Sequence, residues 1–313
     1  MDPPIDVQRS FYPLPLEGRI SCNRILGKTK SMADKIGNHL LVTGRTHVGC
    51  VRPLNEDSYC IDTDTGLLVL ADGMGGHDAG EVASAHVVAS IAQTLRRFMD
   101  TSEEWSQTET VPLREAMAGA ASFNPDPQEE RTLDDLPNPV VKIVQDAIAL
   151  ANAEINQLNR AKGHPDESGM GSTVVGLWAP SFSNQPVVFH VGDSRLYLLQ
   201  RRQLNQATRD HSLYQQWVSF GGKGVPPPQN ILLQAIGPSR VVTPDVRFLS
   251  VVPGDAVLLC SDGLTGMVSD AHIQTALQTL TPDNLDEVCE HLIALAKKGG
   301  GKDNVTVILG CFT

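Results

Sequence analysis

Short apolar runs that end on an acidic residue are the feature that most constrains how this chain can fold. The run Leu67–Leu70 leads directly into ADGMGGH, so Asp72 stands near its end. A carboxylate at the end of a buried strand is unfavourable unless something positive meets it, and the glycines that follow let the backbone approach such a partner. The same placement recurs at Glu56 and Asp57 in NED, Asp193 in VGDSR, Asp262 in CSDGL and Asp303 in KDN.

Apolar patterns of two kinds indicate the elements of the fold. Short runs rich in Val, Leu or Ile and bounded by Gly, Pro, Asp or Asn are typical of β-strands. They cover residues 67–71, 172–178, 187–191, 195–200, 256–261 and 305–311. Longer stretches with apolar residues at helical spacing predict helices over 81–98, 139–158, 271–279 and 284–297. Because the strands come in consecutive groups with helices outside them, we expect an α+β fold in which helices cover sheets.

The 313 residues are 41% hydrophobic, which is enough for a sizeable core. We expect an irregular N-terminal arm over residues 1–40, followed by a single domain over 41–313. Residues 100–138 are predicted to form a solvated acidic insertion, because ten acids against two arginines give this segment −8 of the formal net charge of −11. Residues 211–240 are rich in Gly and Pro and too long for an ordinary connection, so they predict a mobile lobe or a functional loop.

Charge, cysteine usage and run length exclude several classes of protein. The sequence has no basic stripe, so we expect no nucleic-acid partner. No apolar run is long enough to cross a bilayer and the start lacks a signal-peptide pattern, so we expect no membrane association and a cytoplasmic location. The six cysteines form no regular framework, which is typical of free thiols, and no Cys-x5-Arg spacing of a thiolate phosphatase is present. A monomer is the simplest expectation.

Taken singly, each acidic motif has an ordinary explanation as a turn or a surface segment. Together they predict a shared cation site, because strand ends can converge at one edge of a sheet and crowded carboxylates repel unless cations hold them. Oxygen ligands without a His-Cys cluster favour Mg²⁺ or Mn²⁺ over Zn²⁺. Two such ions about 3.5–4 Å apart suit in-line attack of water on a phosphoryl group. Arg52, close to Glu56, is a natural ligand for that phosphate.

Six motifs resemble those of the metal-dependent protein serine/threonine phosphatases of the PP2C (PPM) family, in its bacterial form. They are VRPLNEDSY, LADGMGGHDAGEVAS, GSTVVG, HVGDSRLYLL, LLCSDGL and GGKDNVTVI, and they follow the family's order between about residues 43 and 311. The resemblance implies a central antiparallel β-sandwich flanked by helices in α-β-β-α layers, with the site at one end. It also implies hydrolysis of phosphoserine and phosphothreonine by a metal-bridging water or hydroxide at a Mg/Mn binuclear centre, without a covalent intermediate. Phosphorylated proteins would be the substrates, and a Ser/Thr kinase would be the opposing partner.

The resemblance implies a role for each matching acid. Asp57, Asp72 and the carbonyl of Gly73 would hold the first two ions, with Asp72 bridging them. Asp262 and Asp303 would complete the shell of the second ion.

Further roles follow from the same resemblance. Glu56 would act partly through water, Arg52 would bind the substrate phosphate, and His77 matches a histidine proposed as general acid. Asp193, together with Asp262, would hold a third and weaker ion. Residues 211–240 match the family's flap, which shapes substrate access.

Two departures from the family pattern bear on these roles. Many relatives carry an acid where this chain has Gly266, which weakens the assignment of the third ion. His77 follows Met-Gly-Gly rather than Asp-Gly directly, so a structural role at the start of a helix explains this histidine as well as a role as general acid does.

Other functions remain to be weighed against this one. A catalytically inactive phosphoprotein-binding relative would usually have lost a metal ligand, whereas here all are present. A serine hydrolase with Ser194 as nucleophile lacks the G-x-S-x-G motif, and GGGKDN lacks the residues of a phosphate-binding loop. Among the histidines, His190 is expected in the core, and His211, at the start of the flap, is a candidate for substrate contact.

Overall fold

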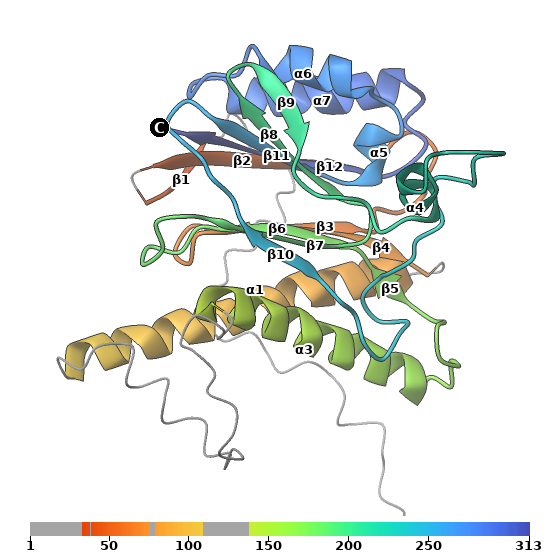
Figure 1. Cartoon of the computed structure of the whole chain (residues 1–313), viewed down its shortest axis with the longest axis horizontal. Coiled ribbons are helices and arrows are strands. Elements are labelled where there is room, and N and C mark those ends of the chain that lie inside the picture. The colour runs from red at the N-terminus through yellow and green to blue at the C-terminus, as the bar shows by residue number, and fades with distance from the viewer. Residues whose placement is uncertain (1–32, 38, 76–78, 109–137) are drawn as a thin grey trace, which may run out of the picture.

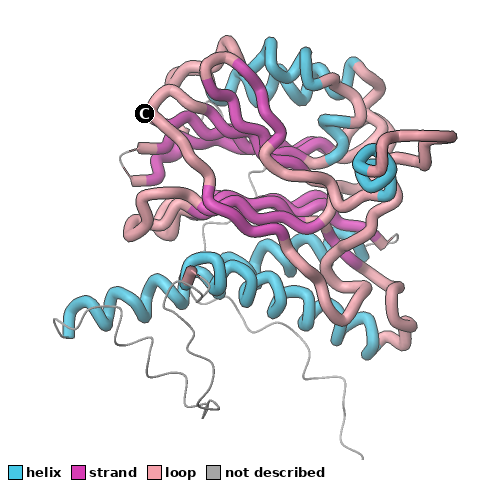
Figure 2. The backbone as a smooth tube through the Cα atoms, viewed as in Figure 1, coloured by secondary structure: helices cyan, strands magenta, loops and turns pink. Residues whose placement is uncertain are grey.

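The protein folds into two antiparallel sheets packed face to face and covered by helices (Figures 1 and 2). The structure, a computed structural model, describes residues 33–37, 39–75, 79–108 and 138–313. Most of the expected arm, most of the acidic insertion and His77 therefore lie outside the described residues. No helix in the described part of the chain combines the length and apolarity needed to span a bilayer.

In the described part of the chain, each sheet has six strands, and all pairings between them are antiparallel. Sheet A has the order β1-β2-β12-β11-β8-β9: Asp34–Ile36, Leu40–His47, Val305–Phe312, Ala256–Cys260, Arg195–Gln200 and Gln203–Gln206. Sheet B has the order β10-β7-β6-β4-β3: Asp245–Phe248, Val187–Val191, Val174–Trp178, Leu67–Met74 and Asp57–Asp62. The short strand β5 (Gly171–Ser172) pairs with the end of β4.

Two pairs of helices form the outer layers. Helices α1 (Ala79–Thr108) and α3 (Pro139–Ala161) cover sheet B, whereas α6 (Asp270–Leu277) and α7 (Leu285–Lys298) cover sheet A (Figure 1). The short helices α4 (Leu213–Ser219) and α5 (Asp262–Thr265) lie at one end of the sandwich. The predicted α+β fold with α-β-β-α layers is confirmed.

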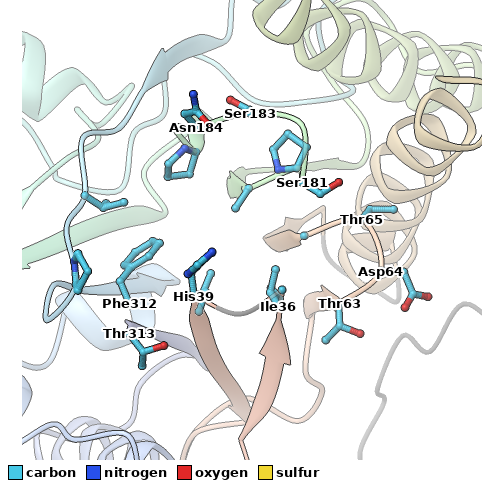
Figure 3. Close-up of a pocket in the computed structure, with 18 of the residues that line it drawn as sticks. Ile36, His39, Thr63, Asp64, Thr65, Ser181, Ser183, Asn184, Phe312 and Thr313 are labelled. Atoms are coloured by element: carbon cyan, nitrogen blue, oxygen red, sulfur yellow. The ribbon is translucent and has the colours of Figure 1, made fainter. Parts of the chain in front are cut away.

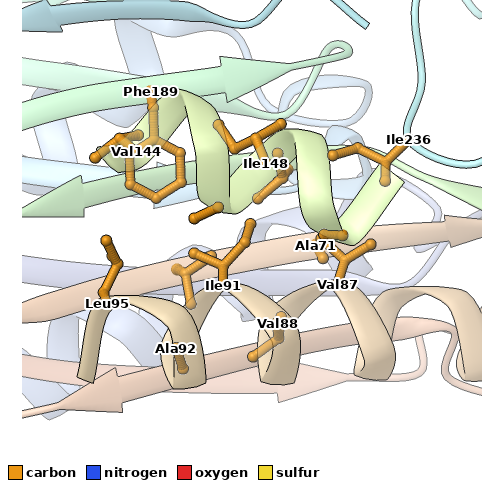
Figure 4. Packing of buried hydrophobic residues seen from close by; sticks show 14 of the residues in the cluster. Ala71, Val87, Val88, Ile91, Ala92, Leu95, Val144, Ile148, Phe189 and Ile236 are labelled. Atoms are coloured by element: carbon orange, nitrogen blue, oxygen red, sulfur yellow. The ribbon is translucent and has the colours of Figure 1, made fainter. Parts of the chain in front are cut away.

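The layers enclose three apolar cores. One lies between α1, α3 and sheet B and contains Leu95, Ile148 and Phe189 (Figure 4). A second lies between the sheets, and a third between sheet A and the pair α6 and α7. Strands β6, β7, β11 and β12 are buried along their whole length, which explains why they read as continuous apolar runs rather than as alternating patterns.

The structure differs from the sequence expectations at several boundaries. Strand β1 belongs to sheet A, so the irregular arm ends before residue 34 rather than at residue 40. Helix α1 continues to Thr108, into the segment expected to be a solvated insertion. The predicted strand 172–178 is divided between β5 and β6, and helix α4 lies within 211–240. Strands β1, β2, β3, β9 and β10 were missed. Strands β1, β9 and β10 are short and partly exposed, and β2 and β3 mix apolar with polar residues, so none carries a continuous apolar run.

Three asparagines on one face of α3 fasten the C-terminal end of the flap, residues 211–240, to the helix. Asn152 donates to the carbonyls of Ser239 and Arg240. Asn156 donates to the carbonyls of Gly237 and Pro238, at 2.9 and 3.1 Å.

The third asparagine extends the same fastening to the next segment. Asn159 accepts from the backbone N–H of Met170 and donates to its carbonyl, just before β5. Helix α3 thereby positions both the flap and the strand that pairs with the end of β4.

Replacing Asn156 with Leu should destabilise the fold without touching the acidic motifs. The carbonyls of Gly237 and Pro238 lose the Asn156 donor and keep only Asn159 Nδ2 at 3.3 Å and the N–H of Glu167 at 3.1 Å, and each lost hydrogen bond costs about 0.5–1.5 kcal/mol. The free energy of unfolding in urea measures the effect. Leu150→Ala on the same helix is the control, because Leu150 is 44% exposed and should change stability by less than about 0.5 kcal/mol. Equal stability of the two variants would contradict the role of Asn156 in fastening the flap to α3.

Candidate metal and phosphate site

The antiparallel pairing of β3 with β4 places Asp57 directly opposite Asp72. Side chains opposite each other on neighbouring antiparallel strands have Cβ atoms about 4.5–5.5 Å apart. Two acids separated by a hairpin in the sequence are thus brought together by strand register alone. The other end of this hairpin lies at the opposite pole of the sandwich.

Asp57 joins the two sheets. Its Oδ2 accepts hydrogen bonds from Ser261 Oγ at 2.8 Å and Thr306 Oγ1 at 2.6 Å, both from the sheet A side. Its Oδ1 is buried and has no hydrogen-bond partner in the structure. Burial raises the pKa of Asp57 to about 7, even though the two hydroxyl donors favour its charged form.

Asp262 and Asp303 arrive from the two central strands of sheet A. Asp262 follows β11 and begins α5, and Asp303 stands just before β12, which pairs with β11. The two segments pack so closely that position 263 must be glycine, because a Cβ there would lie 1.9 Å from the carbonyl oxygen of Asn304. The Asp-Gly of the SDG motif therefore reflects close packing as well as a turn.

Asp72 lies at the centre of the acids. Its pKa is raised well above its usual value, first by burial and then by the negative charges of Asp57, Asp262, Asp193 and Asp303. Burial and the negative charge of Asp303 also raise the pKa of Asp262. Carboxylates gathered in this way repel one another unless protons or cations neutralise their charge.

Glu56 is held in place by its backbone. Its carbonyl accepts from Gly73 N at 3.1 Å and from Ser84 Oγ at 2.5 Å. Its N–H donates to Asn304 Oδ1 at 2.8 Å. Gly73 and the neighbouring Gly80 leave no room for a side chain, since a Cβ on Gly73 would lie 2.0 Å from the Gly80 carbonyl oxygen.

Asn304 was not singled out from the sequence. Besides holding Glu56, its amide nitrogen donates to the carbonyls of Val48 and Leu54, so it organises the loop that carries Arg52. Ser261, which supports Asp57, was also missed. Both are small polar residues directly adjacent to an acid in its motif, and that adjacency is the signal that could have identified them.

Arg52 lies at the edge of the cluster. Its Nη2 donates to Asp303 Oδ2 at 2.7 Å, and the two side chains are 47% and 34% exposed. This hydrogen bond, reinforced by the charges of Glu56 and Asp262, raises the pKa of Arg52. The arginine therefore contacts the acids from the solvent-exposed edge of the cluster.

Asp193 also joins the cluster. It lies in the turn between β7 and β8, and burial, followed by the charge of Asp262, raises its pKa to about 7. Gly266 closes α5 and supplies no carboxylate nearby, so a third ion would rely on Asp193 and Asp262.

The histidines and serine weighed from the sequence have different surroundings. His190 is 2% exposed, as expected for a core residue. The side chain of His211 is only 12% exposed and stacks on His190, so the expected substrate contact is wrong for this arrangement. Ser194 is 1% exposed and its Oγ lies 2.7 Å from Thr173 Oγ1, which does not fit a hydrolase nucleophile.

The acids brought together fit hard divalent cations. Their ligand atoms are carboxylate oxygens, which Mg²⁺ and Mn²⁺ prefer, and the Oδ1 of Asp57 is a buried acceptor without a donor. Among the described residues, these carboxylates do not form a group whose ligand atoms all lie within 4.8 Å of one another.

A separate surface pocket of about 560 Å³ lies at the opposite pole (Figure 3). Its lining includes Ile36, Thr65 and Phe312, together with the turn that joins β3 to β4. Because Asp57 begins β3 and Asp72 lies near the end of β4, this pocket is at the far end of the hairpin from the acids.

Comparison with known proteins identifies relatives of the whole domain. The family model for protein phosphatase 2C matches residues 43–295. The serine/threonine phosphatase stp of Listeria monocytogenes is 32% identical over 273 residues, which cover 85% of this chain and 93% of stp. The serine/threonine protein phosphatase PstP of Mycobacterium tuberculosis is 35% identical over 274 residues, which cover 86% of this chain and 44% of PstP.

Solved structures show the same similarity. The catalytic domain of PstP in complex with two manganese ions has a TM-score of 0.66 and 31% identity, covering 88% of this chain and 99% of that one. A structure of PppA from Pseudomonas aeruginosa has a TM-score of 0.64 and 28% identity, covering 88% and 99%.

The acid cluster predicts how the stability of the metal-free protein depends on pH. The folded-state pKa values of Asp57 and Asp193, about 7, lie above their usual value of 3.8. Groups shifted in this direction stabilise the fold fully below the unfolded pKa, and this contribution is lost as the pH rises from the unfolded pKa through the folded pKa. In EDTA, the melting temperature should therefore fall between about pH 4 and pH 7 and level off at higher pH.

Added Mn²⁺ should raise the melting temperature most at the higher pH, because carboxylate ligands bind metal in their deprotonated form. Asp57→Asn, which cannot ionise at this position, should weaken the pH dependence in EDTA. A melting temperature that follows the same pH profile with EDTA and with Mn²⁺ would argue against a cation site at these acids.

Proposed function

The chain belongs to the protein phosphatase 2C family, and we propose that it removes phosphate from phosphoserine and phosphothreonine by direct attack of water at a pair of Mg²⁺ or Mn²⁺ ions. Its family membership and relatives make it a metal-dependent serine/threonine protein phosphatase. The proposal concerns how the acids of this chain perform the hydrolysis.

The observation that carries the proposal is the convergence of carboxylates around Asp72, with the unpartnered Oδ1 of Asp57 among them. Asp57, Asp72, the carbonyl of Gly73, Asp262 and Asp303 would hold the ions. When bound, a pair of divalent ions lowers the pKa of water and neutralises charge on the phosphoryl oxygens.

Several roles extend this arrangement. Asp193 would hold a third ion together with Asp262, and Glu56 would contribute partly through water. Since Glu56 is fixed by Gly73, Ser84 and Asn304, its position relative to the end of β4 is set before any ion binds.

Arg52 would bind the substrate phosphate. A guanidinium can bond two phosphate oxygens at once, and Arg52 is exposed at the rim of the acids. Its present partner, Asp303, is itself a proposed ion ligand. A cation bound to Asp303 would neutralise part of its negative charge and so weaken its ion pair with Arg52. The guanidinium would then be free to bind phosphate.

Direct attack by water also agrees with the surrounding nucleophiles. The thiol of Cys260, close to the SDG motif, is buried, and burial raises its pKa to about 12, so it is not a thiolate at neutral pH. Ser194 is buried and hydrogen-bonded to Thr173. Neither group is suited to form a phosphoenzyme.

The remaining expectations stay proposals. His77, as general acid to the leaving alkoxide, would contribute on the order of 10²–10⁴-fold. Phosphorylated proteins are the expected substrates, and an opposing Ser/Thr kinase, a monomeric state and a cytoplasmic location are proposals that rest on the sequence alone.

Hydrolysis of a phosphothreonine peptide should require Mn²⁺ and stop in EDTA, and Asp262→Ala should remove it. Loss of residues that merely support a metal ligand costs 10–100-fold, so loss of a ligand should lower turnover by more than about 100-fold. Circular dichroism should show an intact fold. Asp283→Ala, at an exposed acid of the α6–α7 connection, is the matched control and should remain active. Near-normal turnover of Asp262→Ala in Mn²⁺ would remove Asp262 from the site.

Arg52→Ala should raise KM for a phosphopeptide more than it lowers kcat, because the arginine contacts the phosphate in the bound substrate as well as in the transition state. Arg52→Lys keeps the charge without the planar fork and should fall between the wild type and the alanine variant. Steady-state kinetics in saturating Mn²⁺ measure both constants. An unchanged KM in Arg52→Ala would refute phosphate binding at this position.

A further inference from the structure

The turn that carries Asp193 is fastened to the first residues of the flap. The backbone N–H of His211 donates to the carbonyl of Gly192 at 2.9 Å, and the N–H of Gly192 lies 3.3 Å from His211 Nδ1. On the other side of Asp193, Arg195 donates to both carboxylate oxygens of Asp210, at 2.7 to 3.1 Å. The residues on both sides of Asp193 are thus held at the base of the flap, by Asp210, which directly precedes it, and by His211, its first residue.

The imidazole of His211 is fixed in one orientation. Because Nδ1 accepts from Gly192, the ring proton is on Nε2, which faces Asp245 Oδ2 at 3.5 Å. The ring stacks on His190, with centroids 4.5 Å apart and planes inclined by 28°. His190 is held in turn, since its Nε2 donates to the carbonyl of Arg209 at 2.8 Å.

These contacts form a hydrogen-bond network rather than a metal site. The ligand atoms of His190, His211 and Asp245 lie within 4.8 Å of one another, which is close enough to suggest a cation. However, Nε2 of His211 carries the ring proton and Nε2 of His190 is bonded to a carbonyl.

The same turn is connected to Asp72 from its other face. Gly192 has φ of +105°, and a Cβ there would lie 2.6 Å from Thr173 Cγ2. Ser194 Oγ lies 2.7 Å from Thr173 Oγ1, which accepts from the backbone N–H of Asp72 at 3.1 Å. A displacement of the turn would therefore move Asp193 directly, and it would move Asp72 at the end of β4 through Thr173.

His211 also joins the two arms of the flap. Its carbonyl accepts from Leu233 N at 2.7 Å, and Ser212 forms a β-bridge with Leu232. The returning arm of the flap thus meets the outgoing arm at the residue that holds Gly192.

We propose that His211 is a positioning residue that, through the backbone of Gly192, holds Asp193 against Asp262 and so ties the base of the flap to the third divalent-ion site. This role rests on the proposed function, because it needs a cation site at Asp193. His211 itself touches neither ion nor substrate. Its effect should appear in the affinity of the ion held by Asp193, and less in that of the two ions held by the other acids.

The test compares His211→Phe with His211→Asn in the full-length chain. Phe keeps a flat ring against His190 but loses the acceptor for Gly192 N–H, whereas the Asn side-chain oxygen can restore it. Mn²⁺ binding is measured by isothermal titration calorimetry, and the Mn²⁺ concentration for half-maximal hydrolysis is measured in parallel. Asp193→Asn is the reference for loss of the third ion.

We expect His211→Phe to weaken the weakest Mn²⁺ site by about 10–100-fold, the usual effect of removing a residue that orients a metal ligand. The tighter sites should keep their affinity, and His211→Asn should recover most of the loss. If His211→Phe does not fold, His211→Ala replaces it with the same expectation.

Two results overturn the positioning role while leaving the proposed function intact. In one, His211→Phe binds every Mn²⁺ ion as the wild type does. In the other, the Phe and Asn variants lose affinity equally at all sites, which indicates a general structural role. A wild-type protein that binds no Mn²⁺ overturns both the proposed function and this inference.

Discussion

The contact of Asp57 with Ser261 and Thr306 is the interaction on which the rest of the site depends. It places a carboxylate of sheet B against hydroxyls from the side of sheet A, at the end of an otherwise apolar interface between the sheets. Because the hydroxyls use only one oxygen, the other remains available while the side chain is held rigidly. A preorganised ligand of this kind loses little freedom when it binds a cation.

Local patterns were sufficient to predict an α+β fold with helices covering sheets and to mark the acids, whereas the α-β-β-α layers were implied by the resemblance to a family. Fully buried strands such as β6 and β12 read as apolar runs, and each acid of the cluster stands at or beside the end of such a run. The convergence of Asp57 with Asp72 was implied by the resemblance to a family, because the strand that begins at Asp57 was not predicted from the sequence. The convergence of Asp193 with Asp262 was supplied by resemblance to a family, since no local pattern specifies which strand ends meet.

The residues missed from the sequence act through contacts between distant segments. Asn304 holds Glu56 and the loop before it, across some 250 positions of the chain. His211 was expected to face substrate because it begins an irregular segment, yet tertiary contacts turn its ring toward His190 and Gly192. Small polar residues and histidines have no burial pattern of their own, so their partners are visible only in three dimensions.

The flap is consequently not uniform along its length. Its two ends are tied down, at one end by the bonds of Asp210 and His211 to the Asp193 turn and at the other by the asparagines of α3. Between them, the segment around Gly221 and Gly224 has backbone angles that favour glycine and space around both residues. Phe220 and Val225 are 81% and 91% exposed there. A lobe with fixed ends and an open tip can meet substrates of different shape while leaving the carboxylates in place, because its base shares hydrogen bonds with the acid cluster and its tip does not.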